Sequence, residues 1–518
     1  MNYYFLIALL FLAACDSDTQ SDATSDTAGA NGDQRVETES MMDMGDETPS
    51  PAMDQEMSAD LDAGMASDDA TPNMDMTPAD SAPPSGDPTE LSPEPEDDAA
   101  YIYDQDVVHQ FELVLTPENM EILDSDPAAE IYVPGTLIFE GVSYENVGVR
   151  YKGSAGAWIN CVEGSTPENP WNFTGRITCP KLGLKISFNK YDSEGRFFGL
   201  KKLQFHAMNQ DQSLMRERLG YWLFRQMGVA APRANHVKVS LNGDRVGLYA
   251  NIEYIDGRFT RSRFEDGKGN LYKEVWPTWN DFSGELTAAK LAQGLRTNED
   301  ENPSFANVLA FSDAMQAGSD ARAQALPEWM DIEYLARFIA VDRTIAADDG
   351  AFHFYCQRTG CANHNFYVYE EDEGSNLWVI PWDLDNAFVV LDPSISTIAD
   401  LFLKVVDAWY DLSVPCAPHE GAASWTPWQI PPICDPLIRT YAEHFMDDYR
   451  AAMDVLLDGP FSPEVVEEKL SEWSAQIAPI VDEVRGFNSE HISAQEWTEA
   501  LGNLRTRIGI LRQIASMQ

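Results

Sequence analysis

The stretch IPWDLDNAF at residues 380–388 follows a short apolar segment and places two carboxylates, Asp383 and Asp385, two positions apart. In an extended or turn conformation both side chains can face one cation, and hard cations such as Mg²⁺ prefer oxygen ligands of this kind. The spacing alone fits an aspartate-rich turn at the end of a strand better than a metal site. Whether this turn binds a metal therefore depends on the residues around it.

Polar residues upstream of the turn form a second group. A helix is predicted over residues 328–347, and Asp348 and Asp349 come directly after it. Asn365 begins a short strand, and a second strand follows at 377–380. In phosphoryl transfer one carboxylate orients the attacking hydroxyl, while an asparagine and a later aspartate hold Mg²⁺. The order of these residues fits that chemistry, although the two aspartates could also only cap a helix or turn.

The N-terminal half of the folded region is predicted to be mostly strands, and residues 107–115 alternate apolar and polar side chains as a strand does. Its clearest helix spans 213–227 and ends before Gly228, a residue suited to the left-handed position after a helix. Asn242 and Gly243 predict a hairpin turn. The predicted strands lie at 107–115, 132–139, 146–151, 181–188, 202–206, 236–241 and 246–254.

The periodicity changes at about Ser304 to that of amphipathic helices, of which the longest are predicted at 436–457, 462–486 and 493–517. A β-rich N-terminal part followed by a helical C-terminal part predicts an α+β fold with two lobes.

Lysines near the predicted strand ends are candidates to contact phosphate groups. Lys152 lies in a turn that contains glycine and serine, and Lys181 and Lys185 lie on a later strand. Glu217, on the helix at 213–227, could pair with one of these lysines. Each signal is weak alone, because lysines are common on protein surfaces.

Taken in order, these segments resemble the spore coat protein H (CotH) kinase family over about residues 107–390. With the helical tail included, residues 101–518 are expected to form one CotH kinase-like domain. The resemblance rests on short motifs in a fixed order, among them VGVRYKG at 147–153, DQSLMRERL at 211–219, NFYVY at 365–369 and PWDLD at 381–385. It implies an atypical protein-kinase-like fold that uses ATP with Mg²⁺ or Mn²⁺ and phosphorylates serine in partner proteins.

The resemblance also implies roles for individual residues. Asp349 would be the catalytic aspartate, Lys152 or Lys181 would face the phosphates, and Glu217 would be their partner on the helix. Three side chains would lie at the metal: Asn365, Asp383 and Asp385. The chain departs from the family pattern by an insertion between Asp349 and Asn365, which leaves open whether Asp348 or Asp349 is the active residue.

Six cysteines of the folded region form three neighbouring couples: Cys161 and Cys179, Cys356 and Cys361, Cys416 and Cys434. Local pairing into three disulfides is the simplest arrangement, and it fits an exported protein. A metal site is the alternative, but the chain has no Cys-x-x-Cys couple.

The N-terminus has the pattern of an export signal. Residues 5–14 are apolar but too few to span a bilayer, and the sequence LAAC at 12–15 resembles the lipobox of bacterial lipoproteins. This resemblance implies lipidation of Cys15 and attachment to a membrane outside the cytoplasm, at the periplasmic face or the cell surface. An ordinary cleaved signal is the alternative. No Lys or Arg precedes Cys15, which departs from the usual signal.

Residues 16–100 contain 24 acidic residues and one basic residue, Arg35, and no aromatic residue. Such a segment predicts a disordered, acidic linker. The remaining region, 101–518, has 61 acidic and 34 basic residues, a net charge of −27. We therefore expect no nucleic-acid partner, because that function needs a basic surface.

Two functions fit these features. The first is an exported, lipid-anchored kinase that transfers phosphate from ATP to Ser or Thr of exported proteins. The second is a catalytically inactive kinase-like module for adhesion or envelope assembly, which the scarcity of ATP outside the cytoplasm favours. A metal-dependent hydrolase would need an activated-water site, and no histidine cluster supports one.

Overall fold

A computed structural model of the chain describes residues 99–517, except for 167, 170, 348, 358–359, 373, 390–408 and 421–427. The predicted signal, Cys15 and the acidic linker up to residue 98 lie outside the described residues, as does Asp348. The described residues belong to one compact unit, in which buried hydrophobic side chains form two cores.

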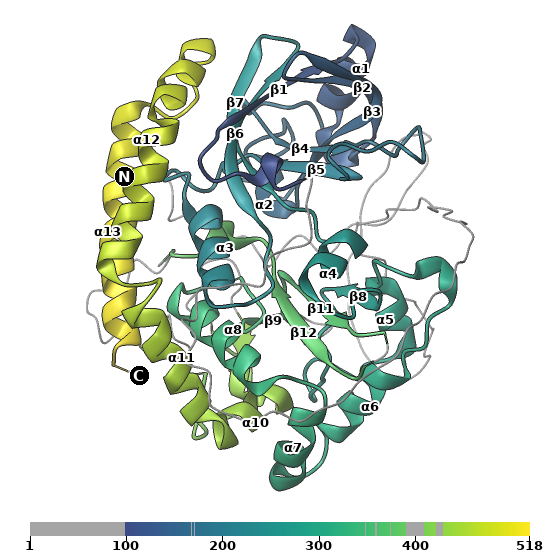
Figure 1. Cartoon of the computed structure of the whole chain (residues 1–518), viewed down its shortest axis with the longest axis vertical. Helices are drawn as coiled ribbons and strands as arrows, with labels where there is room; N and C mark the ends of the chain where they lie inside the picture. Colours follow the sequence, from purple (N-terminus) through teal and green to yellow (C-terminus); the bar gives the residue numbers. More distant parts are fainter. Residues whose placement is uncertain are drawn as a thin grey trace, which may run out of the picture. The chain divides into compact units, whose positions relative to one another are not determined.

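Seven strands of the N-terminal part close into a barrel (Figure 1). They are β1 (His109–Val114), β2 (Val133–Phe139), β3 (Val142–Lys152), β4 (Gly183–Ser187), β5 (Lys202–His206), β6 (Ala234–Leu241) and β7 (Arg245–Ile252). Their order around the barrel is β1-β2-β3-β4-β5-β7-β6, with β1 and β6 parallel and the other neighbours antiparallel. All seven predicted strands are confirmed.

The first core fills this barrel. Every second residue of β1 is buried, because side chains of a strand alternate between its two faces. Phe111 packs against Phe139 and Phe205, with ring centroids 4.9 and 5.0 Å apart. Asn242 and Gly243 both have positive φ and form the predicted turn between β6 and β7.

Helix α3 (Arg216–Gln226) starts three residues later than the sequence predicts. The Asp211 carboxylate accepts hydrogen bonds from the backbone amides of Ser213 and Arg216, and this capping turn takes up the residues before the helix. Gly228 follows the helix with a φ of +71°, in the left-handed region as expected.

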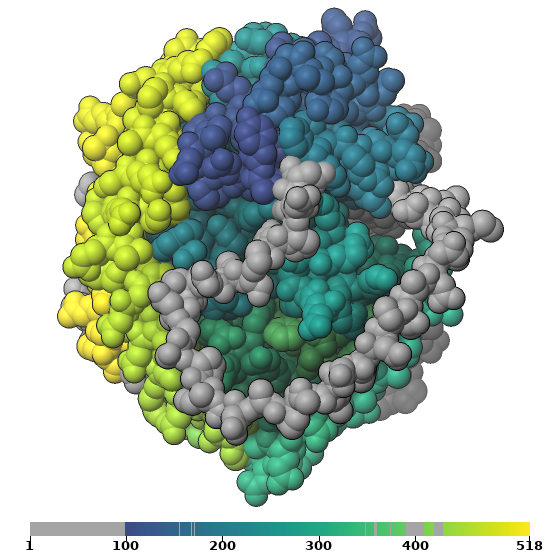
Figure 2. Space-filling model, in the orientation of Figure 1, coloured from purple at the N-terminus to yellow at the C-terminus, as the bar shows by residue number. Residues whose placement is uncertain are grey.

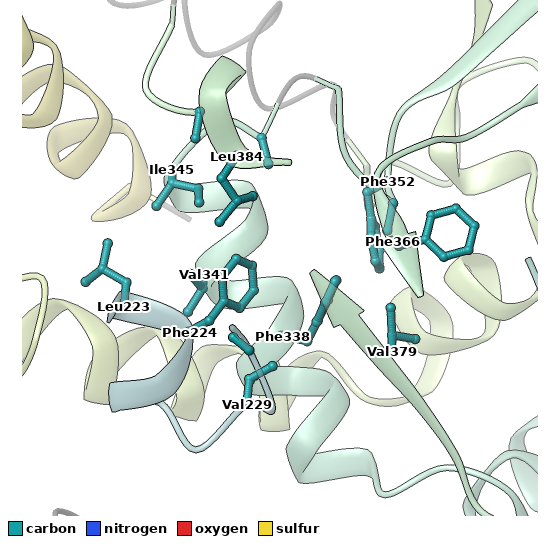
Figure 3. Close-up of a cluster of buried hydrophobic side chains, with 14 of the residues drawn as sticks. Leu223, Phe224, Val229, Phe338, Val341, Ile345, Phe352, Phe366, Val379 and Leu384 are labelled. Atoms are coloured by element: carbon teal, nitrogen blue, oxygen red, sulfur yellow. The ribbon is translucent and has the colours of Figure 1, made fainter. Parts of the chain in front are cut away.

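The second core surrounds a small antiparallel sheet of β12 (Leu377–Pro381), β11 (Phe366–Glu370) and β8 (Asn270–Lys273), in that order. Helix α8 (Ile332–Thr344) contributes to the same core and is shorter than predicted, because the Asp331 side chain caps it at Tyr334. Figure 3 shows side chains of α3, α8, the sheet and the turn after β12 in this core: Phe224, Phe338, Phe366, Val379 and Leu384.

A second sheet, which the sequence analysis did not predict, lies in the C-terminal part. Its order is β10 (Gly360–Ala362), β9 (Phe354–Gln357), β14 (Trp428–Ile430) and β13 (His419–Glu420). All three predicted disulfides are present: Cys161–Cys179, Cys356–Cys361 and Cys416–Cys434. The Cys356–Cys361 bridge joins directly opposed residues of β9 and β10.

The C-terminal helices are α10 (Pro436–His444), α11 (Met446–Asp458), α12 (Pro463–Phe487) and α13 (Ala494–Ala515). The predicted helix over 436–457 is two helices with a break at Phe445. On the face shown in Figure 2, the C-terminal helices lie along the N-terminal part of the described chain. Lys238 of β6 pairs with Glu483 of α12 at 3.0 Å, so this helix is fastened to the barrel.

The remaining helices are short: α1 (Pro117–Ser125), α2 (Ala155–Trp158), α4 (Gly257–Arg263), α5 (Ala288–Gly294), α6 (Ala306–Ala314) and α7 (Ser319–Ala325). No helix in the described part of the chain combines the length and the apolar character that a membrane span requires. The β-rich N-terminal part and the helical C-terminal part are thus confirmed, while the division into two lobes stays a prediction.

Candidate active site

The acidic turn at residues 380–388 lies at the end of β12, against helix α3. Asp383 has a left-handed backbone, with φ 51° and ψ 70°, which aspartate tolerates better than most residues. Its backbone N–H donates to the hydroxyl of Tyr221 on α3, at 2.9 Å. The Arg216 guanidinium donates to the carbonyl oxygen of Asp385, also at 2.9 Å. Side chains of helix α3 therefore hold the backbone of the turn, and the two carboxylates of the turn stay available for other contacts.

A glycine lets the turn and the helix come this close. A Cβ atom at Gly220 would lie 2.9 Å from Cδ1 of Leu384, inside normal contact distance. Leu384 begins the short 3-10 turn η6 (Leu384–Asn386) that carries Asp385. Glu217 lies on the same helix, so the Gly220 contact sets the spacing between the two acidic segments.

Glu217 is buried, with 3% of its surface exposed. Its Oε1 accepts a hydrogen bond from Nδ1 of His206 at 2.7 Å. Its Oε2 is buried and has no hydrogen-bond partner among the described residues. Burial and the negative charge of Asp383 raise the pKa of Glu217 well above its usual value. A buried carboxylate oxygen without a donor is costly, and it fits a site that binds a cation.

His206, the last residue of β5, joins Glu217 to Lys152. The ammonium group of Lys152 lies 2.9 Å from Nε2 of His206. An ammonium group only donates, so Nε2 accepts and Nδ1 carries the proton given to Glu217. Burial and the charge of Lys152 lower the pKa of His206 to about 3, in agreement with a neutral ring. The predicted lysine–glutamate pair is thus bridged by a histidine that the sequence analysis did not select.

Lysines from three strands face this region. Lys152 ends β3, and burial lowers its pKa to about 8, with Asp383 opposing the shift and Lys185 and Lys273 adding to it. Lys185 of β4 lies 3.3 Å from the hydroxyl oxygen of Tyr254. Lys273 ends β8. The positive groups therefore come from the barrel and from the β12-β11-β8 sheet.

Four carboxylates gather opposite these lysines. Burial, followed by the charges of Asp383, Glu217 and Asp349, raises the pKa of Asp385 well above its usual value. Ligand atoms of His206, Glu217 and Asp383 lie within 4.8 Å of one another. Both nitrogens of His206 already have partners, so the carboxylate oxygens remain to hold a cation. The residues present therefore fit a divalent metal ion with oxygen ligands.

Asp349 reaches the cluster from the end of α8. The Arg343 guanidinium donates to the carbonyl oxygen of Ala347 and holds the turn that precedes Asp349. The backbone N–H of Phe388 donates to the carbonyl oxygen of Ile345 at 2.7 Å, which ties the acidic turn to the same helix end. The negative charge of Asp349 acts on Asp385, so these two predicted residues lie close together.

Asn365 lies beside the base of the acidic turn. It has a left-handed backbone with a φ of 57°, and its carbonyl oxygen accepts from the N–H of Trp382 at 3.1 Å. This contact places Asn365 next to the residue before Asp383. Its position is compatible with the predicted role as a metal ligand, and that role stays a prediction.

Lys181 lies apart from the cluster. It donates to the carbonyl oxygen of Leu248 and stands over the ring of Tyr249, 5.0 Å from the centroid. Burial lowers its pKa to about 7, without a contribution from the carboxylates. Of the two lysines that could face phosphates, Lys152 therefore lies in the site and Lys181 does not.

The chain is similar to several known proteins. The model of the family described as "CotH kinase protein" matches residues 149–509. The inner spore coat protein H of Bacillus subtilis (strain 168) is 23% identical over 195 residues, which are 36% of this chain and 50% of that protein. An inner spore coat protein H-like protein of the same organism is 36% identical over 85 residues, 16% of this chain and 26% of that protein.

Among solved structures, the Helicobacter pylori proinflammatory kinase CtkA aligns over 62% of this chain and 94% of its own, with 11% identity and a TM-score of 0.18. That score is too low to carry an argument. The alignments with the curated relatives span half of one protein and about a quarter of the other. The family model, in contrast, covers more than half of the 518 residues and includes every member of the carboxylate cluster. The chain belongs to the CotH kinase family.

Proposed function

We propose that the chain is an exported, lipid-anchored atypical kinase that transfers phosphate from ATP to Ser or Thr of proteins outside the cytoplasm. The observation that carries the proposal is the cluster itself. Carboxylates from three segments meet lysines from three strands, and a buried oxygen of Glu217 has no hydrogen-bond donor among the described residues. Family membership supports a kinase as the class of enzyme.

Each side of the cluster has a part in this reaction. Asp383, Asp385 and the open oxygen of Glu217 would hold Mg²⁺ or Mn²⁺, with Asn365 beside them. The bound cation would supply positive charge to the phosphates of ATP. The Lys152 ammonium group would contact the same phosphates from the opposite side.

Asp349 would accept a hydrogen bond from the Ser or Thr hydroxyl and orient it. The hydroxyl oxygen forms a bond to the γ-phosphorus, the bond between that phosphorus and the β–γ bridging oxygen breaks, and ADP leaves. The hydroxyl proton passes to Asp349. Asp349 is itself partly exposed, so a protein substrate can reach it.

We also propose that the two hydrophobic cores correspond to two kinase-like lobes. Lys152, Lys185 and His206 come from strands of the barrel, whereas Asp349, Asp383 and Asp385 follow elements of the second core. The cluster then lies where the two cores meet, which is where a nucleotide binds between lobes.

The kinase proposal is tested by transfer of labelled γ-phosphate from ATP with Mg²⁺ or Mn²⁺, to the chain itself and to exported proteins. We expect Asp383→Asn to lower transfer by about 10²–10³-fold, the effect of removing one charge-stabilising group. Asp482→Asn, an exposed carboxylate on α12, is the matched control and should transfer like wild type.

Equal transfer by Asp383→Asn and wild type would remove this site from the reaction. No transfer by wild type, together with a nucleotide-induced rise in melting temperature that Asp383→Asn loses, would favour the inactive kinase-like module instead.

The location is tested separately. We expect full-length protein to fractionate with membranes and mass spectrometry to find a lipid on Cys15. Cys15→Ala should release the protein into the soluble fraction outside the cytoplasm. Membrane association that is unchanged in this variant would contradict the lipid anchor.

A further inference from the structure

A cavity of about 340 Å³ lies between the barrel and the C-terminal helices, away from the carboxylate cluster. Its walls come from the segment before β4, the loop before α3, strand β7, the end of α12 and the α12–α13 connection. Helix α12 lies beside β6 and β7 in Figure 1. Lys181, the lysine that the candidate active site does not use, lines it together with Arg485 and His491.

Lys181 has spare hydrogen-bonding capacity in this cavity. Its ammonium group has three donors, and among the described residues its hydrogen bond is to the carbonyl oxygen of Leu248. No carboxylate pairs with it within the described part of the chain. A partly buried ammonium group without an anionic partner is unfavourable, and an anion bound in the cavity would remove that cost.

Arg485 adds a second cation with open donors. Its guanidinium donates to the carbonyl oxygen of His491 and lies 3.9 Å from Glu496. Glu496 is engaged in the capping box of α13, where its carboxylate accepts from the amide and hydroxyl of Ser493. Most of the five N–H donors of Arg485 therefore stay available.

The acidic residues at the cavity do not compete for its positive end. Asp211 is buried, and its carboxylate accepts from Ser213 and Arg216. Glu490 is exposed at the rim. The rest of the lining is mostly apolar: Met208, Leu214, Leu248, Val481, Val484 and Ile492.

From this arrangement we infer that the cavity binds a small amphiphilic anion, with a carboxylate or phosphate head at Lys181 and Arg485 and an aliphatic tail along the apolar wall. The site is separate from the candidate active site, so the inference stands whether or not the chain is a kinase. Glu496 offsets part of the positive charge of Arg485. A head group with one negative charge would therefore balance most of the charge that remains on Lys181 and Arg485.

The test measures binding to the full chain by isothermal titration calorimetry with three probes of equal tail length: octanoate, octyl phosphate and octanol. We expect at least one anion to bind at least tenfold more tightly than the neutral alcohol, since a hydrogen bond to a charged group gives about this discrimination. The preferred anion identifies the head group as carboxylate or phosphate.

Two variants locate the site. Lys181→Met keeps the aliphatic stem but removes the charge, and Arg485→Gln keeps a polar group; each should weaken the preferred anion at least tenfold at an unchanged melting temperature. Lys190→Met, an exposed lysine over Tyr132, is the matched control and should bind like wild type. Binding of no anion, equal binding of octanol, or full affinity in both site variants would overturn the inference.

Discussion

The barrel interior and the carboxylate cluster are both buried, but they differ in how their groups are satisfied. Phe111 in the barrel contacts the rings of other aromatic residues, and its apolar side chain needs no hydrogen-bond partner. Glu217 in the cluster is equally buried, yet one of its oxygens has no donor among the described residues. The packing of Phe111 stabilises the fold. The unpaired oxygen of Glu217 lowers the stability of the folded chain and leaves an acceptor for a ligand.

A buried carboxylate outside the cluster shows that burial alone is not the cause. Asp435 is 1% exposed, and both of its oxygens have donors. Oδ1 accepts from the amides of Leu437 and Ile438, and Oδ2 accepts from Trp276 and Thr278. The unpaired oxygen of Glu217 is therefore a feature of the cluster. It distinguishes a candidate binding site from a carboxylate with a structural role, such as Asp435.

The largest expected effect is in the barrel. Phe111→Ala removes a 2%-exposed ring and should lower the free energy of unfolding by about 3–5 kcal/mol, through lost burial and the cavity left behind. Denaturant unfolding of the full chain measures this. Phe487→Ala, which removes a 51%-exposed ring, should change it by less than about 1 kcal/mol. Similar losses in both variants would contradict the assignment of Phe111 to the core.

The next effect concerns the cluster and a divalent cation. Mg²⁺ or Mn²⁺ at about 100 times its dissociation constant should stabilise wild type by about 2.7 kcal/mol, because the ion binds the folded chain. Asp385→Asn should remove most of this gain, yet be at least as stable as wild type without the ion, since it relieves repulsion among the carboxylates. Melting curves with and without the ion measure both. An equal gain in the variant would mean that Asp385 is not a ligand.

These two regions also differ in how far the sequence predicts them. Strand β1 of the barrel follows from a period of two residues, and the start of α13 follows from Ser493 and Glu496. The strands β9, β10, β13 and β14 have two to four residues each, too few for any period to appear. The break at Phe445 is likewise local and leaves the helical pattern on both sides intact.

In the site, the residues predicted by motif are brought together, except for Lys181. Lys181 lies just before β4 and Lys185 lies within it, about 13 Å further along an extended chain, and the two side chains contact different residues. Only the pairing of the strands shows which of them faces the carboxylates. His206 carries no signal of its own, because its role depends on the helix that brings Glu217 to the end of β5.

An effect of similar size tests the structural acid, Asp435. Burial raises its pKa from 3.8 to about 6 in the folded chain, so the folded state binds the proton more tightly than the unfolded state. The stability from this group is then fully present below about pH 4 and is lost as the pH rises to about 6. A rise in pKa from 3.8 to about 6 corresponds to roughly 3 kcal/mol.

Asp435→Asn removes this titration. Unfolding measured between pH 4 and 7 should show wild type losing stability relative to the variant as the pH rises. A difference between the two proteins that is constant over this range would show that Asp435 keeps the same pKa on unfolding.

The smallest expected effect tests whether His206 acts as the bridge between Lys152 and Glu217. Glutamine can copy a neutral imidazole here, because its carbonyl oxygen accepts from Lys152 while its amide donates to Glu217. Leucine can do neither. In the phosphate-transfer assay, His206→Leu should lower kcat/KM for ATP by about tenfold, the worth of one hydrogen bond to a charged group. His206→Gln should recover most of this loss.

The two variants have similar volume, so a purely structural role for His206 would impair both equally, which melting temperatures would reveal. If both variants transfer phosphate like wild type, Lys152 holds its position without the bridge.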